Sequence, residues 1–187
     1  MNHLTMGGRV LLGLVFLCSA AGKGRGGDAF RAFRESVGQL VPSLRRRARP
    51  LVGLTGVAVA TVVAEALVVV LLALPGTSSA GFALAAALLT AFTAALAAAL
   101  RRKLRATCRC FGGDAPIAPR HIVRNLLLLV VAGTALAVSG PGTGTSYSPS
   151  LLLAVGCGAV LALLTVKLDE LADLFALSST RREERTR

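Results

Sequence analysis

The stretch LVGLTGVAVATVVAEALVVVLLAL, residues 51–74, carries a single charged side chain, Glu65. Its first part, Leu51–Ala64, is apolar on every side of a helix, and Phe82–Leu100 has the same character. A helix without a polar face belongs in lipid or deep inside a large core. A chain of 187 residues cannot provide such a core. The stretch therefore predicts a membrane-spanning helix.

Other apolar segments extend this prediction to the whole chain. The composition, 54% hydrophobic with 4% aromatic residues, is more apolar than that of ordinary soluble domains. Turn residues at Pro75-Gly76 and between Ser139 and Pro149 separate the segments. We expect an all-α integral membrane helical bundle with about five transmembrane helices, although the last two are short against the ~20 residues that a bilayer requires. The expected spans are Leu4–Gly22, Leu51–Leu74, Phe82–Leu100, Ile122–Val138 and Leu151–Val166.

The formal net charge of +12 follows a topological pattern. Lys and Arg are absent from Pro75–Gly81 and Ser139–Ser150, whereas the loops Lys23–Arg49 and Arg101–Arg124 are rich in them. Basic loops are retained in the cytoplasm, so we expect the N-terminus outside and the C-terminus inside. The charges lie between apolar runs rather than on a folded basic surface with groove-reading partners, which argues against a nucleic-acid partner.

An amphipathic segment is predicted near residues 28–44, between the first two spans. Its apolar residues recur at helical spacing, with Arg31, Arg34 and Glu35 between them. The pattern fits a helix in the cytoplasmic interface of the membrane or a cytoplasmic helix packed on the bundle. The apolar residues are Phe30, Phe33, Val37, Leu40, Val41 and Leu44.

Glu65 is expected to have a buried partner, because an ionisable group inside a span is costly and usually paired. Counted from the cytoplasmic ends of their helices, Glu65 lies ~21 Å and Arg9 ~20 Å deep. We therefore predict an Arg9–Glu65 ion pair. The pair either locks the first span against the second, or Glu65 acts as a proton or quinone ligand.

Cys108 and Cys110 are the candidate redox pair. Five basic residues surround them, and positive neighbours stabilise a thiolate. A disulfide between residues two apart closes a tight ring, which favours easy reduction. Two unreactive reduced cysteines are the alternative. The basic neighbours are Arg101, Arg102, Lys103, Arg105 and Arg109.

The remaining cysteines and histidines add no metal site. Of the two histidines only His121 is near the pair, so the ligand count falls short of the ~4 that a metal site needs. Cys18 and Cys157 stand alone in the sequence, and each is expected to be a small buried packing residue.

Short motifs along the chain resemble those of the MauE family, small bacterial membrane proteins similar in layout to the DoxX group. The most specific is Cys108-Arg109-Cys110-Phe111-Gly112 followed by Arg124-Asn125-Leu126. The resemblance covers roughly residues 7–138. The other matching residues are Gly8, Arg9, Leu12, Gly13, Phe16, Lys23, Phe30 or Phe33, Val41, Pro42 and Glu65.

The resemblance implies a multi-pass protein of the bacterial inner membrane that takes part in methylamine metabolism. Such proteins are associated with processing, transport or maturation of the disulfide-rich small subunit of methylamine dehydrogenase, an exported enzyme, alongside a thioredoxin-like partner. Transferred to this chain, Cys108 and Cys110 are the thiol pair, supported by Lys23, Arg124 and Asn125. No hydrolase or transferase motif is present, so thiol-disulfide exchange is the enzyme-like activity to expect.

The predicted organisation has three parts. Residues 7–138 form the MauE-like membrane domain, 139–166 an outer loop and the fifth span, and 167–187 a charged cytoplasmic tail. Because an exported client lies outside and the cysteine pair inside, electrons have to cross the membrane, by way of Cys18 or Cys157 or a bound quinone. The alternative function is a non-catalytic scaffold or translocation partner of a thioredoxin-like protein, held together by Gly- and Ala-rich helix faces.

Overall fold

A computed structural model describes residues 3–40, 50–102, 119–138 and 156–165. All of these residues belong to helices or the short turns between them, and no strand occurs among them, which confirms the all-α prediction. A ten-residue helix, Gly156–Thr165, is called the C-terminal helix below. The longer helices are α1 (His3–Gly24), α2 (Gly27–Leu40), α4 (Pro50–Ala73), α5 (Ser78–Arg101) and α6 (Pro119–Val138).

Four of the helices, α1, α4, α5 and α6, are long and apolar enough to cross a membrane. They correspond to the first four predicted spans, so the membrane bundle is confirmed to that extent. The C-terminal helix falls within the predicted fifth span, but its ten described residues are too few to cross a bilayer on their own. The rest of that predicted span lies outside the described residues.

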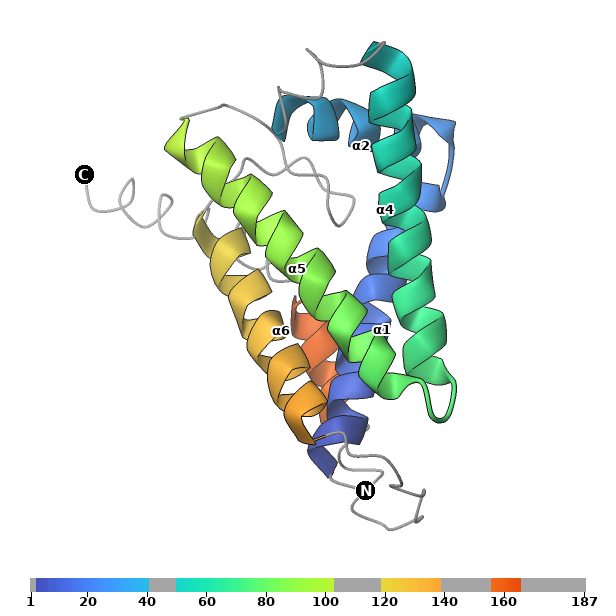
Figure 1. The fold of residues 1–187 in the computed structure, drawn as a ribbon, viewed down its shortest axis with the longest axis vertical. Coiled ribbons are helices and arrows are strands. Elements are labelled where there is room, and N and C mark those ends of the chain that lie inside the picture. Colours follow the sequence, from blue (N-terminus) through green and yellow to red (C-terminus); the bar gives the residue numbers. More distant parts are fainter. Residues whose placement is uncertain (1–2, 41–49, 103–118, 139–155, 166–187) are drawn as a thin grey trace, which may run out of the picture.

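The helices α4, α5 and α6 follow one another as antiparallel neighbours (Figure 1), and α1 packs against α4 and α6. The short helix α2 lies across one end of the bundle, next to the start of α4. The end that carries α2 is called the α2 end. It also holds the last turn of α5 and the first turn of α6, whereas the N-terminus lies at the opposite end.

The α4–α5 connection shows how the sequence closes a helix. Gly76 has φ +84°, a backbone conformation that L side chains rarely adopt. The Thr77 hydroxyl donates a hydrogen bond to the Leu71 carbonyl at 2.7 Å, satisfying an acceptor in the last turn of α4. The Pro75-Gly76 pair thus forms the turn that its residue types predict.

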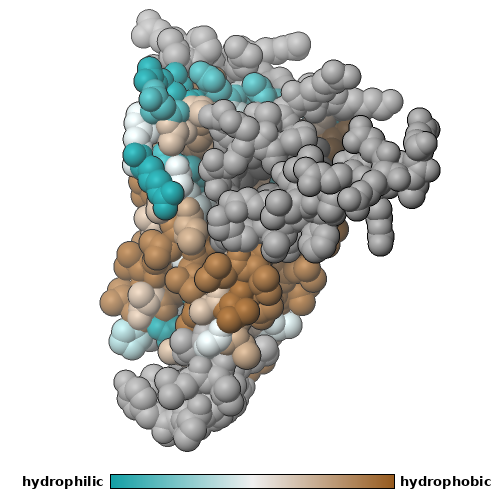
Figure 2. All heavy atoms as spheres, turned by 180° about the vertical axis from the view of Figure 1, so that it is seen from behind, coloured by the Kyte–Doolittle hydropathy of each residue, from teal (hydrophilic) through white to brown (hydrophobic). Residues whose placement is uncertain are grey.

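The main core lies where α1, α4, α5 and α6 meet. It contains Phe16 of α1, Val68 of α4 and Phe82 of α5, all buried, together with small alanines of α6. Because lipid is as apolar as these side chains, such a core is stabilised mainly by close packing. Many large apolar residues, such as Leu127, Val130 and Leu163, face outward, and Figure 2 shows a hydrophobic band across one face of the molecule.

Helix α2 has one face on the bundle. Phe33 and Val37 pack on Ala58 in the first half of α4, while Arg31 and Glu35 are exposed. The amphipathic pattern of the sequence therefore matches the packed face. Residues 41–44 of the predicted segment, with Pro42, lie outside the described residues.

Two glycines mark close approaches between helices. A Cβ on Gly81 of α5 would lie 3.1 Å from the Leu72 backbone nitrogen of α4. A Cβ on Gly158 of the C-terminal helix would lie 2.7 Å from the Gly7 carbonyl oxygen of α1. Small residues at such crossings let helix backbones come together in membranes.

Candidate functional site

Lys23 and Glu65 form a buried ion pair between α1 and α4. The Lys23 side chain is 2% exposed and that of Glu65 is fully buried, with Nζ against Oε1. The Ser19 hydroxyl, one turn before Lys23, donates to the same Oε1 at 3.1 Å and accepts from Nζ at 2.9 Å. We call these three residues the Lys23 cluster.

Two aromatic rings complete the surroundings of the Lys23 ammonium. Its Nζ lies 4.7 Å from the ring centre of Phe33 on α2 and 5.5 Å from that of Phe92 on α5. Both distances suit a cation–π interaction. One lysine thus contacts side chains from α2, α4 and α5 as well as Ser19 of its own helix.

The chemistry of the cluster follows from its enclosure. A buried ion pair is tolerated when each charge has partners, and removing one partner leaves the other charge uncompensated. Oε1 of Glu65 accepts from both Lys23 and Ser19, whereas its buried Oε2 has no hydrogen-bond partner among the described residues. This geometry favours the helix-locking role that the sequence analysis offered for Glu65.

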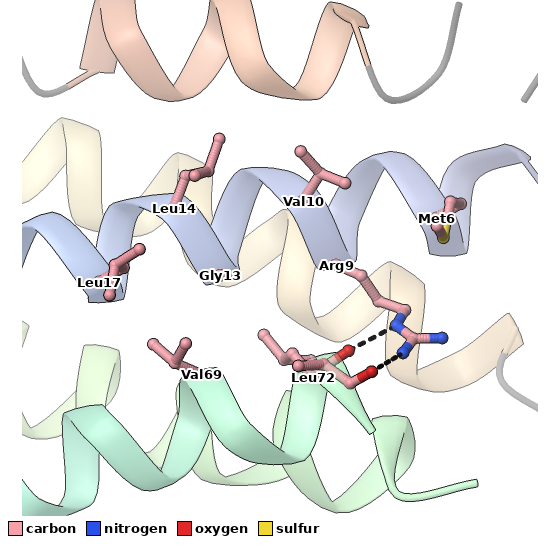
Figure 3. A pocket seen from close by; sticks show the side chains of 9 residues that line it. Met6, Arg9, Val10, Gly13, Leu14, Leu17, Val69 and Leu72 are labelled. Atoms are coloured by element: carbon pink, nitrogen blue, oxygen red, sulfur yellow. Dashed lines mark hydrogen bonds between the residues drawn. The ribbon is translucent and has the colours of Figure 1, made fainter. Parts of the chain in front are cut away.

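The predicted Arg9–Glu65 ion pair is wrong, since Glu65 pairs with Lys23. Arg9 instead caps the end of α4: its Nε donates to the Leu72 carbonyl at 2.7 Å and its Nη2 to that of Ala73 at 3.2 Å (Figure 3). Nη2 also donates to the Leu74 carbonyl at 3.2 Å. Carbonyls in the last turn of a helix lack partners within the helix, and a cation there also interacts favourably with the helix dipole.

The depth estimate failed because of where α4 begins. The first half of α4 lies beside α2, whose Phe33 and Val37 contact Ala58. Glu65 therefore lies opposite Ser19, ten residues or about 15 Å along α1 from Arg9. The i, i+4 spacing of Ser19 and Lys23, which places both on one helix face, was the signal in the sequence that pointed to the real partners. Phe92 had no such signal.

Arg124 and Asn125 lie in the second turn of α6 and are buried, as is His121 in the first turn. Helix α6 begins at Pro119, three residues before the predicted start at Ile122. Helix α6 packs against α5 and α1. Its first turns lie near the α2 end of the bundle, so these polar side chains lie there as well.

The cysteines divide into two groups. Cys108 and Cys110 lie outside the described residues, in the segment between Arg102 and Pro119. Cys18 and Cys157 are unpaired and exposed, so the expectation that they are buried packing residues is wrong. In the part of the chain that the structure describes, no three His, Cys, Asp or Glu side chains gather as a metal site.

The family model of methylamine utilisation protein MauE matches residues 1–138. The chain belongs to the MauE family. The match includes the Lys23 cluster and every helix from α1 to α6, whereas the C-terminal helix lies beyond it. No curated protein and no solved structure is significantly similar to the chain.

Proposed function

We propose that this MauE-family protein is a bacterial inner-membrane accessory protein of methylamine utilisation that helps an exported, disulfide-bearing enzyme to mature. Cys108 and Cys110 carry out thiol–disulfide exchange with a thioredoxin-like partner. The small subunit of methylamine dehydrogenase is the client. Family membership supports the accessory role in methylamine utilisation, and the residues around the cysteines support the redox chemistry.

The observation that carries the redox proposal is the position of the two ends of the cysteine segment. Helix α5 ends at Arg101 and is followed by Arg102, both exposed, and α6 resumes the chain at Pro119. Both points lie at the α2 end of the bundle (Figure 1). The segment thus leaves and re-enters the bundle at the end where most of the described basic residues are found, and positive charge favours a thiolate.

Thiol exchange at this pair needs only a disulfide or dithiol partner. The Cys108 thiolate attacks a disulfide of the thioredoxin-like protein, breaking that bond and forming a mixed disulfide. The Cys110 thiolate then attacks Cys108, forming an intramolecular disulfide and releasing the partner as a dithiol, with two electrons transferred. The reverse sequence reduces the pair, so the same residues serve either direction.

The topology of this proposal places the α2 end in the cytoplasm and the N-terminus outside. A client outside the membrane then requires electrons to cross the bundle. An isoprenoid quinone among the helices is the carrier we propose, with Cys18 on α1 and Cys157 on the C-terminal helix, both exposed, as the alternative route.

The experiment compares Cys108→Ser, Cys110→Ser and their double variant with wild type and with Cys157→Ala. The client's disulfide state is read by alkylation and gel shift, and the abundance of the membrane protein by immunoblot. We expect both single variants to lose client maturation at normal abundance and Cys157→Ala to have a milder effect. Unchanged maturation in the double variant contradicts the redox proposal.

A second candidate is a non-catalytic scaffold that holds the thioredoxin-like protein at the membrane. The observation that favours it is the Lys23 cluster, which joins α1 to α4 and, through the contacts of Lys23 with Phe33 and Phe92, also to α2 and α5, without an exposed reactive group. In that case maturation depends on the abundance of the protein and not on Cys108 or Cys110.

A further inference from the structure

A groove of about 310 Å³ runs along the outside of the bundle between α1 and α4. Arg9 is the charged residue of its lining, and the other lining residues are apolar (Figure 3). The two helices that line the groove, α1 and α4, are both able to span a membrane. Its lining includes Arg9, Gly13, Leu14, Leu17, Val69 and Leu72.

The groove is polar at one end only. Arg9 lies at the level of Leu72, Ala73 and Leu74, where the apolar span of α4 ends. The end of an apolar span is where we expect the lipid headgroups to lie. From there the lining continues along α1 to Leu17, eight residues or about 12 Å towards the middle of the bilayer. A charged end at the membrane boundary and an apolar end at depth match the layout of a lipid molecule.

The Arg9 guanidinium keeps donors for a ligand. Its Nε and Nη2 are occupied by α4 carbonyls. Nη1 has no hydrogen-bond acceptor among the described residues, and in Figure 3 it points away from the two carbonyls. A guanidinium held in place by two of its nitrogens presents the third in a fixed direction, and phosphate is an acceptor that arginine prefers.

We propose that this groove binds one anionic phospholipid, from the leaflet on the side of the Pro75-Gly76 turn. The phosphate accepts from Nη1 of Arg9, and one acyl chain lies over Gly13 towards Leu17. The charge of Arg9 selects an anionic lipid over a zwitterionic one, because a zwitterionic headgroup brings its own cation close to the guanidinium.

Gly13 offers a substitution that fills the groove without disturbing the bundle. A Cβ at this position meets nothing within 4 Å, so the side chain of Gly13→Leu enters the space where the acyl chain lies. Gly56→Leu on α4 is the matched control, since Gly56 also has open space around its Cβ and is not part of the groove lining. Arg9→Gln removes the proposed phosphate donor.

The test uses the full-length protein purified in detergent and titrated with phosphatidylglycerol or phosphatidylcholine, with bound lipid counted by native mass spectrometry. Wild type and Gly56→Leu are expected to bind phosphatidylglycerol at least about tenfold more tightly than phosphatidylcholine, because the choline cation lies close to the Arg9 guanidinium and offsets the attraction of the phosphate. Gly13→Leu and Arg9→Gln are expected to lose that preference.

Three outcomes overturn the proposal. The first is equal binding of the two lipids by wild type. The second is an unchanged preference in Gly13→Leu, at a position whose Cβ has open space around it. The third is a co-purifying isoprenoid quinone that Gly13→Leu displaces, because the occupant is then a quinone and not a phospholipid. The proposal does not depend on the redox role of Cys108 and Cys110.

Discussion

Lys23 contacts Glu65 across the interface between α1 and α4, 42 residues further along the chain. The contact joins the last turn of α1 to the middle of α4. Because α2 begins only three residues after the end of α1 and places Phe33 on the same ammonium group, the pair also fixes α2 across the end of the bundle.

Breaking this pair from one side should destabilise the protein strongly. Lys23→Met leaves the Glu65 carboxylate buried without its cation, which we expect to lower the free energy of unfolding by about 3–5 kcal/mol. The double variant Lys23→Met/Glu65→Leu should recover a large part of that loss. Reversible unfolding in detergent micelles gives the free energy of unfolding of wild type, the single variant and the double variant.

The control for that cycle is the exposed pair Arg31 and Asp28 on α2. Asp28→Asn should change the free energy of unfolding by less than about 1 kcal/mol, since exposed ion pairs contribute little. If Lys23→Met is no more harmful than Asp28→Asn, the Lys23 cluster does not lock the helices.

Phe33 should contribute through both packing and its contact with the Lys23 ammonium. Phe33→Leu keeps an apolar side chain on α4 and removes the ring, so we expect a loss of about 1–2 kcal/mol. In the Lys23→Met background the same substitution should cost less, because the cation is already gone. A coupling energy near zero in this double-mutant cycle argues against the cation–π contact.

Gly81 should resist substitution because of the α4 backbone. A Cβ there also approaches Leu72 Cδ2 at 2.8 Å, so Gly81→Leu has to push α4 and α5 apart, at a cost of about 1–3 kcal/mol. Gly133→Leu on α6 meets nothing within 4 Å of its Cβ and should be tolerated. Thermal unfolding of the two variants, compared with wild type, decides whether the close approach exists.

The proposed orientation predicts which positions react from outside the cell. A cysteine placed at Ser79, exposed beside the Pro75-Gly76 turn, should react with a membrane-impermeant maleimide on intact cells in a cysteine-free background. So should one at Ser146, whereas one at Ser43 should react only after lysis. The reverse pattern inverts the topology and places Cys108 and Cys110 outside.

The sequence predicted the four long spans well because their signal is a long apolar run, which few alternatives imitate. It placed two helix starts too late: α5 begins at Ser78 instead of Phe82, and α6 at Pro119 instead of Ile122. Helix starts depend on polar residues and on proline at the first position, whereas the prediction began each span at its first large apolar residue.

The candidate site was harder to predict because pairing depends on how helices align. Glu65 was correctly identified as needing a buried partner, but that partner was predicted to be Arg9, and Lys23 was named only as a residue matching the family pattern and as support for the cysteine pair. Matching them requires knowing that the first turns of α4 lie beside α2, a tertiary contact that no single helix records. Phe92 lies on α5 and approaches Lys23 only in the folded bundle.

The close approach of Gly158 to α1 bears on how this protein can diverge. The obstacle to a side chain at Gly158 is the Gly7 carbonyl oxygen, a backbone atom. No side-chain replacement on α1 removes that atom, so compensating substitutions there cannot relieve the restriction. Among relatives that keep a helix after the region matched by the family model, we expect glycine to persist at this position while the neighbouring residues of α1 vary. The contact then constrains the sequence of the C-terminal helix but not that of α1.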